Sequence, residues 1–252
     1  MDRVYAIGDI HGHLDKLKVA HALIAEDRAR CGDMDAPIVH VGDLVDRGPD
    51  SFGVIQYLME GQVAGENWVV LKGNHDRMAA MFLRDTPMVD HMLLYDFNWF
   101  HPRIGGIETM ASYGVEVAEG IRTYQLHAAA LAAVPKAHRD YLEALPVMHR
   151  VGDLCFVHAG IRPGVALDDQ VEDDLVWIRQ EFHNSNADHG PLIVHGHTPV
   201  DEVTHYGNRL NIDTGAGHGK GIGVVVIEGR EAWVLGAGGR KDVTQEKPLF
   251  GF

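Results

Sequence analysis

The sequence predicts an α/β fold in which two mixed sheets pack face to face and are flanked by helices, an α/β/β/α sandwich with a helical insertion at about residues 78–145. Three observations support this. Short apolar runs alternate with helical patterns before residue 72, the insertion is helical with aromatic residues interspersed, and short apolar runs return after residue 146. At 252 residues the chain can bury a substantial core, so we expect a single domain over residues 1–252.

The first part of the chain has the pattern of a βαβαβ unit. Its expected strands are short apolar runs at residues 3–7, 38–41 and 68–71. Apolar residues recur at three- and four-residue spacing from Leu14 to Ile24, in a helix that ends near Gly32. A second helix is expected to start at Pro49 and to end at Gly61. Ligands of open α/β sheets bind at the carboxyl ends of the strands, which is where we look for function.

The second sheet is expected to come from strands that follow the insertion. These are predicted at residues 147–149, 154–157, 192–194, 209–212, 223–227 and 232–235. A tight hairpin turn at Gly229-Arg230 joins the last two. The tail after Gly238 is polar and then apolar at Leu249, Phe250 and Phe252, and it receives no functional interpretation.

Composition and charge argue against some classes of function. Apolar residues make up 46% of the chain and charged residues 23%, which is typical of a globular protein. The formal net charge of −14, without a basic run, disfavours a nucleic-acid partner. No apolar stretch approaches the ~20 residues of a membrane span, which disfavours a membrane partner. The first strand begins at once and the chain has 2 cysteines, so we expect a cytoplasmic protein.

Five short segments place Asp, Asn and His directly after expected strands. They are residues 8–12 (GDIHG), 42–48 (GDLVDRG), 73–76 (GNHD), 158–160 (HAG) and 195–197 (HGH). Asp9 and His11 are near enough to reach one ion from one turn, and Asp43 has two oxygens that can bridge two ions. Two divalent cations about 3.5–4 Å apart can clamp a phosphate and activate water. Mixed carboxylate, amide and imidazole ligands suit manganese, iron, zinc or cobalt.

In this order, the segments resemble the calcineurin-like metallophosphoesterases, specifically the phosphoprotein phosphatase family and its bacterial serine/threonine type. The matching signatures are GDxHG, GDxVDRG, GNH[ED], H[AG]G and a late His, over residues 8–198. The resemblance implies the metallophosphoesterase fold and two divalent ions, with manganese first and iron, zinc, cobalt or nickel as alternatives. The implied ligands are Asp9, His11 and Asp43 for the first ion, and Asp43, Asn74, His158 and His197 for the second.

The same resemblance implies catalytic and phosphate-binding residues. His75 would be the general acid that protonates the leaving alkoxide, and Asp46 would hold its other ring nitrogen. Arg47 and Asn74 would contact the phosphate, and Arg179, in a D-x-x-W-x-R stretch, would supply a second guanidinium.

Several positions stay open or depart from the family pattern. Arg162 is a weaker candidate for phosphate binding, and a solvated loop arginine is the slightly favoured interpretation. For His195, contact with substrate and shaping of its loop are equally favoured. His13 is not expected to be a ligand. The third signature ends in Asp76 rather than Glu, and residues 211–216 replace the C-terminal segment of eukaryotic phosphatases.

The leading functional interpretation is a phosphoprotein phosphatase that hydrolyses phosphoserine, phosphothreonine and, as a further option, phosphotyrosine by direct attack of metal-bound hydroxide. The alternative is a symmetrical bis(5'-nucleosyl)-tetraphosphatase acting on dinucleoside polyphosphates, since those enzymes share the signatures. Residues 105–114 resemble a stretch of bacterial protein phosphatases that covers the active-site rim, and a nucleotidase is expected to be longer. An inactive scaffold is least favoured, because every expected position is filled.

Overall fold

The first sheet has six strands, and the βαβαβ unit forms half of it. The strands are β1 (Arg3–Ile7), β2 (Ile38–His40), β3 (Trp68–Val70), β9 (Val224–Glu228), β10 (Glu231–Gly236) and β11 (Gly239–Asp242). Their order in this computed structural model, which describes residues 3–246, is β11-β10-β9-β1-β2-β3. Strands β1, β2 and β3 are parallel, and β9 runs antiparallel to β1, so the sheet is mixed.

The second sheet also has six strands and is also mixed. They are β4 (Met148–Val151), β5 (Leu154–Val157), β6 (Leu192–His195), β7 (Thr204–His205), β8 (Arg209–Asn211) and β12 (Thr244–Gln245). Their order is β12-β7-β8-β6-β5-β4. The central strands β5, β6 and β8 are parallel, and β4 and β7 pair antiparallel to their neighbours.

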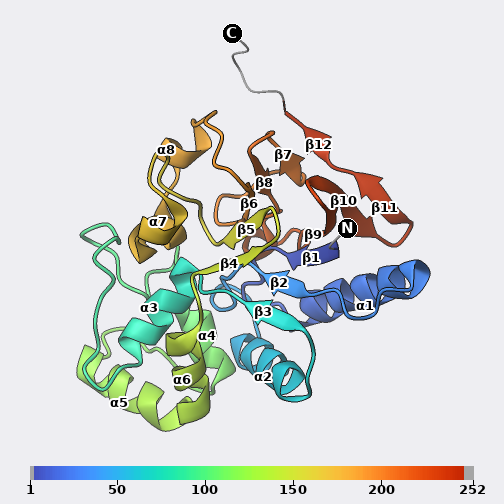
Figure 1. The fold of residues 1–252 in the computed structure, drawn as a ribbon. Coiled ribbons are helices and arrows are strands. Elements are labelled where there is room, and N and C mark those ends of the chain that lie inside the picture. The colour runs from blue at the N-terminus through green and yellow to red at the C-terminus, as the bar shows by residue number, and fades with distance from the viewer. Residues whose placement is uncertain (1–2, 247–252) are drawn as a thin grey trace.

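Helices cover both outer faces of this pair of sheets (Figure 1). The helices are α1 (Leu14–Cys31), α2 (Ser51–Val63), α3 (Asn74–Phe82), α4 (Gly106–Ser112), α5 (Thr123–Ala133), α6 (Lys136–Ala144), α7 (Glu172–Trp177) and α8 (Gln180–His183). Helices α1 to α6 pack on the first sheet, and α7 and α8 pack on the second. The predicted α/β/β/α sandwich and its helical insertion are confirmed. Within residues 3–246, no helix is long and apolar enough to cross a membrane.

The alternation of side chains along β1 shows how the layers form. Val4 and Ala6 point into the core between the two sheets, where they join Phe156 of β5. Tyr5 and Ile7 point the other way, into the core beneath the helices. All four are fully buried, so residues 4–7 of β1 form a continuous buried run after the partly buried Arg3, as is typical of a strand covered on both faces.

Strand pairing differs from the sequence prediction in two respects. The strands at 223–227 and 232–235 were expected in the second sheet, but β9 and β10 instead extend the first sheet beside β1. Strands β7, β11 and β12 were not predicted, because they are short or polar. Strands β7 and β11 pair with their neighbours in sequence, β8 and β10, whereas β12 pairs with the distant β7. The apolar positions Leu249, Phe250 and Phe252 lie outside the described residues.

Gly61 does not end the second helix as predicted. Helix α2 continues to Val63, and Gly61 lies in its last turns. A Cβ atom at this position would lie 1.9 Å from Cζ3 of Trp68 at the start of β3. The glycine therefore serves close packing of the indole ring against the helix rather than helix termination.

Asp27 of α1 ties the edge strand β11 to the helix layer. Its buried carboxylate accepts hydrogen bonds from Nη2 of Arg240 at 2.8 Å and from the Tyr5 hydroxyl at 2.9 Å. Burial alone would raise the pKa of Asp27, but the bonds from Arg240 and Tyr5 hold that pKa below its ordinary value of 3.8. The ionised carboxylate therefore stabilises the fold above about pH 4, and this contribution is lost as the pH falls further.

We expect Asp27→Asn to lower the free energy of unfolding at pH 7 by about 3 kcal/mol, because Arg240 loses its buried partner. The difference from wild type should shrink below about pH 4, where the wild-type carboxylate is protonated too. Urea unfolding at several pH values measures both effects. Asp33→Asn is the control, since it removes only an exposed partner of Arg3 and should cost less than about 1 kcal/mol. A loss for Asp27→Asn that is independent of pH would contradict this account.

Candidate metal centre

The five predicted segments come together where strands of both sheets end. Residues 8–12 follow β1, 42–48 follow β2, 73–76 follow β3, 158–160 follow β5, and 195–197 include the end of β6. Hydrogen bonds join segments from different sheets: Nδ1 of His158 lies 2.9 Å from the Val41 carbonyl oxygen, and the His197 amide donates to Asp9 Oδ2 at 3.1 Å. The strand ends therefore build one site from both sheets.

Backbone strain is concentrated at this site. The non-glycine residues with positive φ among residues 3–246 are His11 (48°), Asp43 (52°), Asp46 (74°), Arg47 (67°) and His197 (67°). All five are candidate site residues from the sequence. The left-handed conformation costs an L-residue about 1–2 kcal/mol and persists only where the surrounding structure enforces it, which is common at active sites.

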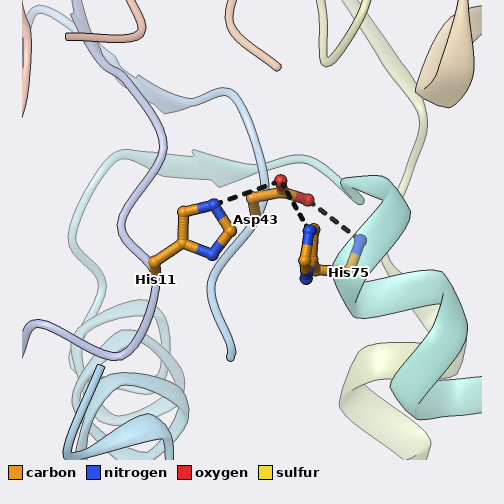
Figure 2. Close-up of side chains that lie close together, drawn as sticks. All are labelled: His11, Asp43 and His75. Atoms are coloured by element: carbon orange, nitrogen blue, oxygen red, sulfur yellow. Dashed lines mark hydrogen bonds and ion pairs between the residues drawn. The ribbon is translucent and has the colours of Figure 1, made fainter. Parts of the chain in front are cut away.

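Asp43 lies at the centre of the site (Figure 2). Its Oδ2 is 3.5 Å from Nε2 of His11 and 4.0 Å from Nε2 of His75. Its Oδ1 accepts a hydrogen bond from the His75 amide at 3.0 Å and lies 3.3 Å from Nε2 of His158. These side chains form two groups with the geometry of metal sites, His11–Asp43–His75 and Asp43–His158–His197, and both groups contain Asp43.

Asn74 completes the second group. Its Oδ1 lies 2.9 Å from Nε2 of His158 and 2.8 Å from Nδ1 of His197. Because Nδ1 of His158 donates to a carbonyl oxygen, the ring would present a lone pair at Nε2 once that nitrogen gives up its proton to a cation. An amide oxygen, imidazole nitrogens and the Asp43 carboxylate thus direct acceptor atoms toward one another. Such a set of buried acceptors fits a cation.

The electrostatics of the site also favour positive charge beside Asp43. Burial opposes a charged imidazole, yet the Asp43 carboxylate raises the pKa of His158 to about 9. Burial would likewise raise the pKa of Asp43, but His158 and His75 hold that pKa well below its ordinary value. A buried carboxylate stays ionised only where cationic partners offset its desolvation. A divalent ion would supply that partner.

Asp9 belongs to neither group, although it lies beside them. Its carboxylate accepts from the His197 amide at 3.2 and 3.1 Å. Burial, followed by the negative charge of Asp213, raises the pKa of Asp9 well above its ordinary value. Asp213 is buried as well and was not predicted as a site residue. Its place two residues beyond β8, at the same edge as the other segments, is the signal that could have found it.

His75 lies between Asp46 and Arg47. Nδ1 of His75 donates to Oδ2 of Asp46 at 2.7 Å, which leaves Nε2 at 3.1 Å from Nη2 of Arg47. Nη1 of the same guanidinium is 3.1 Å from Nε2 of His11. Burial lowers the pKa of His75 to about 3, with the charge of Arg47 acting in the same direction and Asp43 opposing it. The ring is thus fixed in one orientation, with Nε2 beside the guanidinium.

Asp76 ends the third signature and fixes the start of α3. Its carboxylate accepts from the Gly73 amide at 2.8 Å and from the Leu44 amide at 2.9 Å. It therefore links the loop after β2 to the helix that begins with Asn74 and His75. Although Asp76 stands where the family pattern has Glu, its carboxylate still links these two segments.

The two candidate arginines after β5 differ in position. Arg179 is exposed, and its positive charge is among the causes, after burial, that lower the pKa values of His75 and His197. Its charge therefore lies near enough to the site to act on both rings. Arg162 instead forms a two-point ion pair with Asp174, in which Nε donates to Oδ2 at 2.7 Å. Its guanidinium is thus already paired with a carboxylate.

His195 and His13 both lie outside the two metal-type groups. His195 is fully buried, and its Nδ1 lies 3.1 Å from the carbonyl oxygen of Gly196. Its burial and this contact favour a role in shaping the loop. His13 is the residue that precedes α1 at its N-terminus and is in neither metal-type group.

Fold and site together define a metal-dependent phosphoesterase. The family description that matches residues 2–226 is "Calcineurin-like phosphoesterase", a dinuclear-metal-dependent family of hydrolases, and the chain belongs to this family.

The names of similar proteins divide between two kinds of substrate. The chain is 28% identical over 233 residues to the asymmetrical bis(5'-nucleosyl)-tetraphosphatase PrpE of Anoxybacillus flavithermus, covering 83% of this chain and 84% of that one. It is 28% identical over 222 residues to serine/threonine-protein phosphatase 1 of Salmonella typhimurium, covering 84% and 86%. A solved cold-active protein tyrosine phosphatase shares the fold, with a TM-score of 0.65 at 17% identity over 96% of this chain and 78% of that one.

These comparisons bear on one expectation. The longer nucleotidase expected from the sequence was the symmetrical kind, whereas the matched tetraphosphatase is the asymmetrical kind, and it is covered as fully as the matched protein phosphatase. Length therefore does not separate a protein phosphatase from a tetraphosphatase of the asymmetrical kind. The resemblance to phosphoesterases that the five segments predicted is confirmed.

Proposed function

We propose that this chain is a phosphoprotein phosphatase that hydrolyses phosphoserine and phosphothreonine, with phosphotyrosine as a further substrate. The observation that carries this proposal is the Asp46–His75 pair, 2.7 Å apart, next to the acceptor groups around Asp43 and the guanidinium of Arg47. Leaving-group protonation, phosphate binding and metal binding then occur within one site.

The proposed metal centre holds two divalent ions. Asp9, His11 and Asp43 would hold the first, and Asp43, Asn74, His158 and His197 would hold the second. When bound, such a pair polarises a phosphate and lowers the pKa of coordinated water. Manganese is our first choice, with iron, zinc, cobalt or nickel as alternatives, because the donors are nitrogen and oxygen without a thiolate.

The other residues bind the phosphate and move a proton. The guanidinium of Arg47 and that of Arg179 would donate to phosphate oxygens, with the Asn74 amide beside them. Nε2 of His75 would hold the proton that the leaving oxygen receives, while Asp46 fixes the ring through Nδ1. A phosphate dianion bound beside Nε2 favours the protonated ring, which opposes the effect of burial on the pKa of His75.

The choice of a protein substrate is supported by residues 105–114. This stretch resembles bacterial protein phosphatases, and it contacts the site directly: the Arg47 amide donates to the Gly105 carbonyl at 3.2 Å, and the Thr109 hydroxyl donates to Asp46 at 2.7 Å. The second candidate is a dinucleoside tetraphosphate hydrolase, favoured by the similarity to PrpE.

A side-by-side assay of the manganese-loaded protein tests this proposal. We expect phosphoserine and phosphothreonine peptides to be hydrolysed with higher kcat/KM than diadenosine tetraphosphate. Chelation of the metal should abolish the activity, and adding Mn²⁺ back should restore it. A clear preference for the dinucleotide would establish the second candidate. The products would then identify the cleavage as symmetrical, giving two ADP, or asymmetrical, giving AMP and ATP.

We further propose that residues 1–252 act as one domain. Helices α1 and α2 share one buried cluster with residues of the insertion, including Leu126 and Leu142, so the insertion and the sheet are packed as one unit.

A further inference from the structure

The Asp46 carboxylate is held from three sides. It is fully buried, and its Oδ2 accepts from His75 Nδ1 at 2.7 Å. The indole N–H of Trp99 lies 3.0 Å from both carboxylate oxygens. The hydroxyl of Thr109 donates to Oδ1 at 2.7 Å. Trp99 and Thr109 both come from the helical insertion, and sequence analysis assigned no role to either.

Thr109 also forms a hydrogen bond with the backbone of Asp46. The Asp46 amide donates to Oγ1 of Thr109 at 2.8 Å, and Oγ of Ser51 lies 3.0 Å from that hydroxyl. One hydroxyl therefore contacts both the amide and the carboxylate of Asp46, whose φ of 74° is in the left-handed region. Donors on both sides fix the carboxylate plane, and with it the direction of the bond to His75.

Two glycines allow this approach. Gly105 has a φ of 99°, and a Cβ there would lie 2.5 Å from the Arg47 amide nitrogen. A Cβ on Gly106 would lie 2.8 Å from Nε1 of Trp99. The pair lets the insertion pack closely enough for Trp99 and Thr109 to reach Asp46.

We propose that Trp99 and Thr109 are positioning residues for leaving-group protonation, which they serve by fixing Asp46 and, through it, the ring of His75. This inference rests on the proposed function, in which His75 is the general acid. Trp99 and Thr109 are both almost completely buried, and the polar atoms of both side chains bond to Asp46, so we assign their effect to Asp46 rather than to direct contact with a substrate.

The test compares two esters of different leaving-group quality. An alkoxide leaving from a phosphoserine peptide needs a proton, whereas p-nitrophenolate leaves without one. We expect Thr109→Val and Trp99→Phe to reduce kcat on the phosphoserine peptide about 10–100-fold, with little change in KM and a much smaller effect on p-nitrophenyl phosphate. Thr109→Ser, which keeps the hydroxyl, should retain most of the activity.

Two controls separate positioning from general damage. Trp68→Phe removes an indole N–H that has no hydrogen-bond partner within residues 3–246, so it should leave both activities unchanged. In a His75→Asn background, Thr109→Val should cause no further loss on the peptide, because the two residues serve one step. Thermal unfolding checks that each variant folds. If Trp99→Phe does not fold, Thr109→Val alone tests the inference.

The outcomes are distinct. Equal losses on both esters, or additive losses in the His75→Asn background, would overturn the inference and leave the phosphatase function standing. Unchanged turnover of the peptide by Thr109→Val would overturn it as well. Wild-type protein that hydrolyses neither ester would overturn the proposed function, and this inference with it.

Discussion

Replacing Asp43 with asparagine is expected to abolish binding of at least one metal ion and to reduce kcat at least about 10³-fold, since metal ions supply several kcal/mol of transition-state stabilisation. Asp43 is the only residue shared by the two metal-type groups among residues 3–246. Its two oxygens reach toward different histidines, with Oδ2 at 3.5 Å from His11 and Oδ1 at 3.3 Å from His158. Asparagine keeps the shape but loses the charge and one oxygen acceptor.

Metal content of the purified variant, measured by atomic spectrometry after manganese loading and dialysis, gives the direct readout. The pKa of His158 should also fall, because the Asp43 carboxylate is what raises it. Asp33→Asn, a change at an exposed carboxylate, is the matched control and should keep both metal and activity. Full wild-type metal content in Asp43→Asn would rule out a bridging role for Asp43.

Replacing His75 with asparagine is expected to lower kcat for alkyl phosphates about 10²–10⁴-fold while leaving both metal ions bound. Asparagine is close to isosteric with part of the ring and can still bond to Asp46, but it cannot donate a proton to the leaving oxygen. The loss on p-nitrophenyl phosphate should be much smaller. Steady-state kinetics on both esters, at matched metal content, measure this difference.

The same variant decides between two roles for His75. The ring lies in one metal-type group with His11 and Asp43, although its Nε2 is as far as 4.0 Å from Asp43 Oδ2. If His75→Asn loses one ion, and both esters slow equally, His75 is a ligand rather than the acid. Retained metal with a selective loss on alkyl phosphates supports the acid.

The parts of the fold and site that were predictable depend on local patterns. The strand at residues 3–7 is apolar after Arg3, and the structure has it with the same bounds. The polar residues after such strands, from Asp9 to His197, lie at one edge because parallel strands end together. The types of these residues and their positions after expected strands were therefore enough to identify them from the sequence.

What was missed depends on contacts between distant segments. The edge strand β11 is polar, and it is held by Arg240 bonding to Asp27, 213 positions earlier in the chain. From the sequence Gly61 resembles a helix end, but its role is to let the indole ring of Trp68, at the start of β3, pack against α2. Trp99 in turn reaches Asp46 from an insertion whose packing no short pattern describes.

The most direct test of a dinuclear centre is anomalous diffraction from crystals of this protein soaked in manganese. We expect two anomalous peaks about 3.5–4 Å apart, with the Asp43 carboxylate between them and His11 on one side. His158 and His197 should lie on the other. No peak, a single peak, or two peaks that do not share Asp43 would contradict the account.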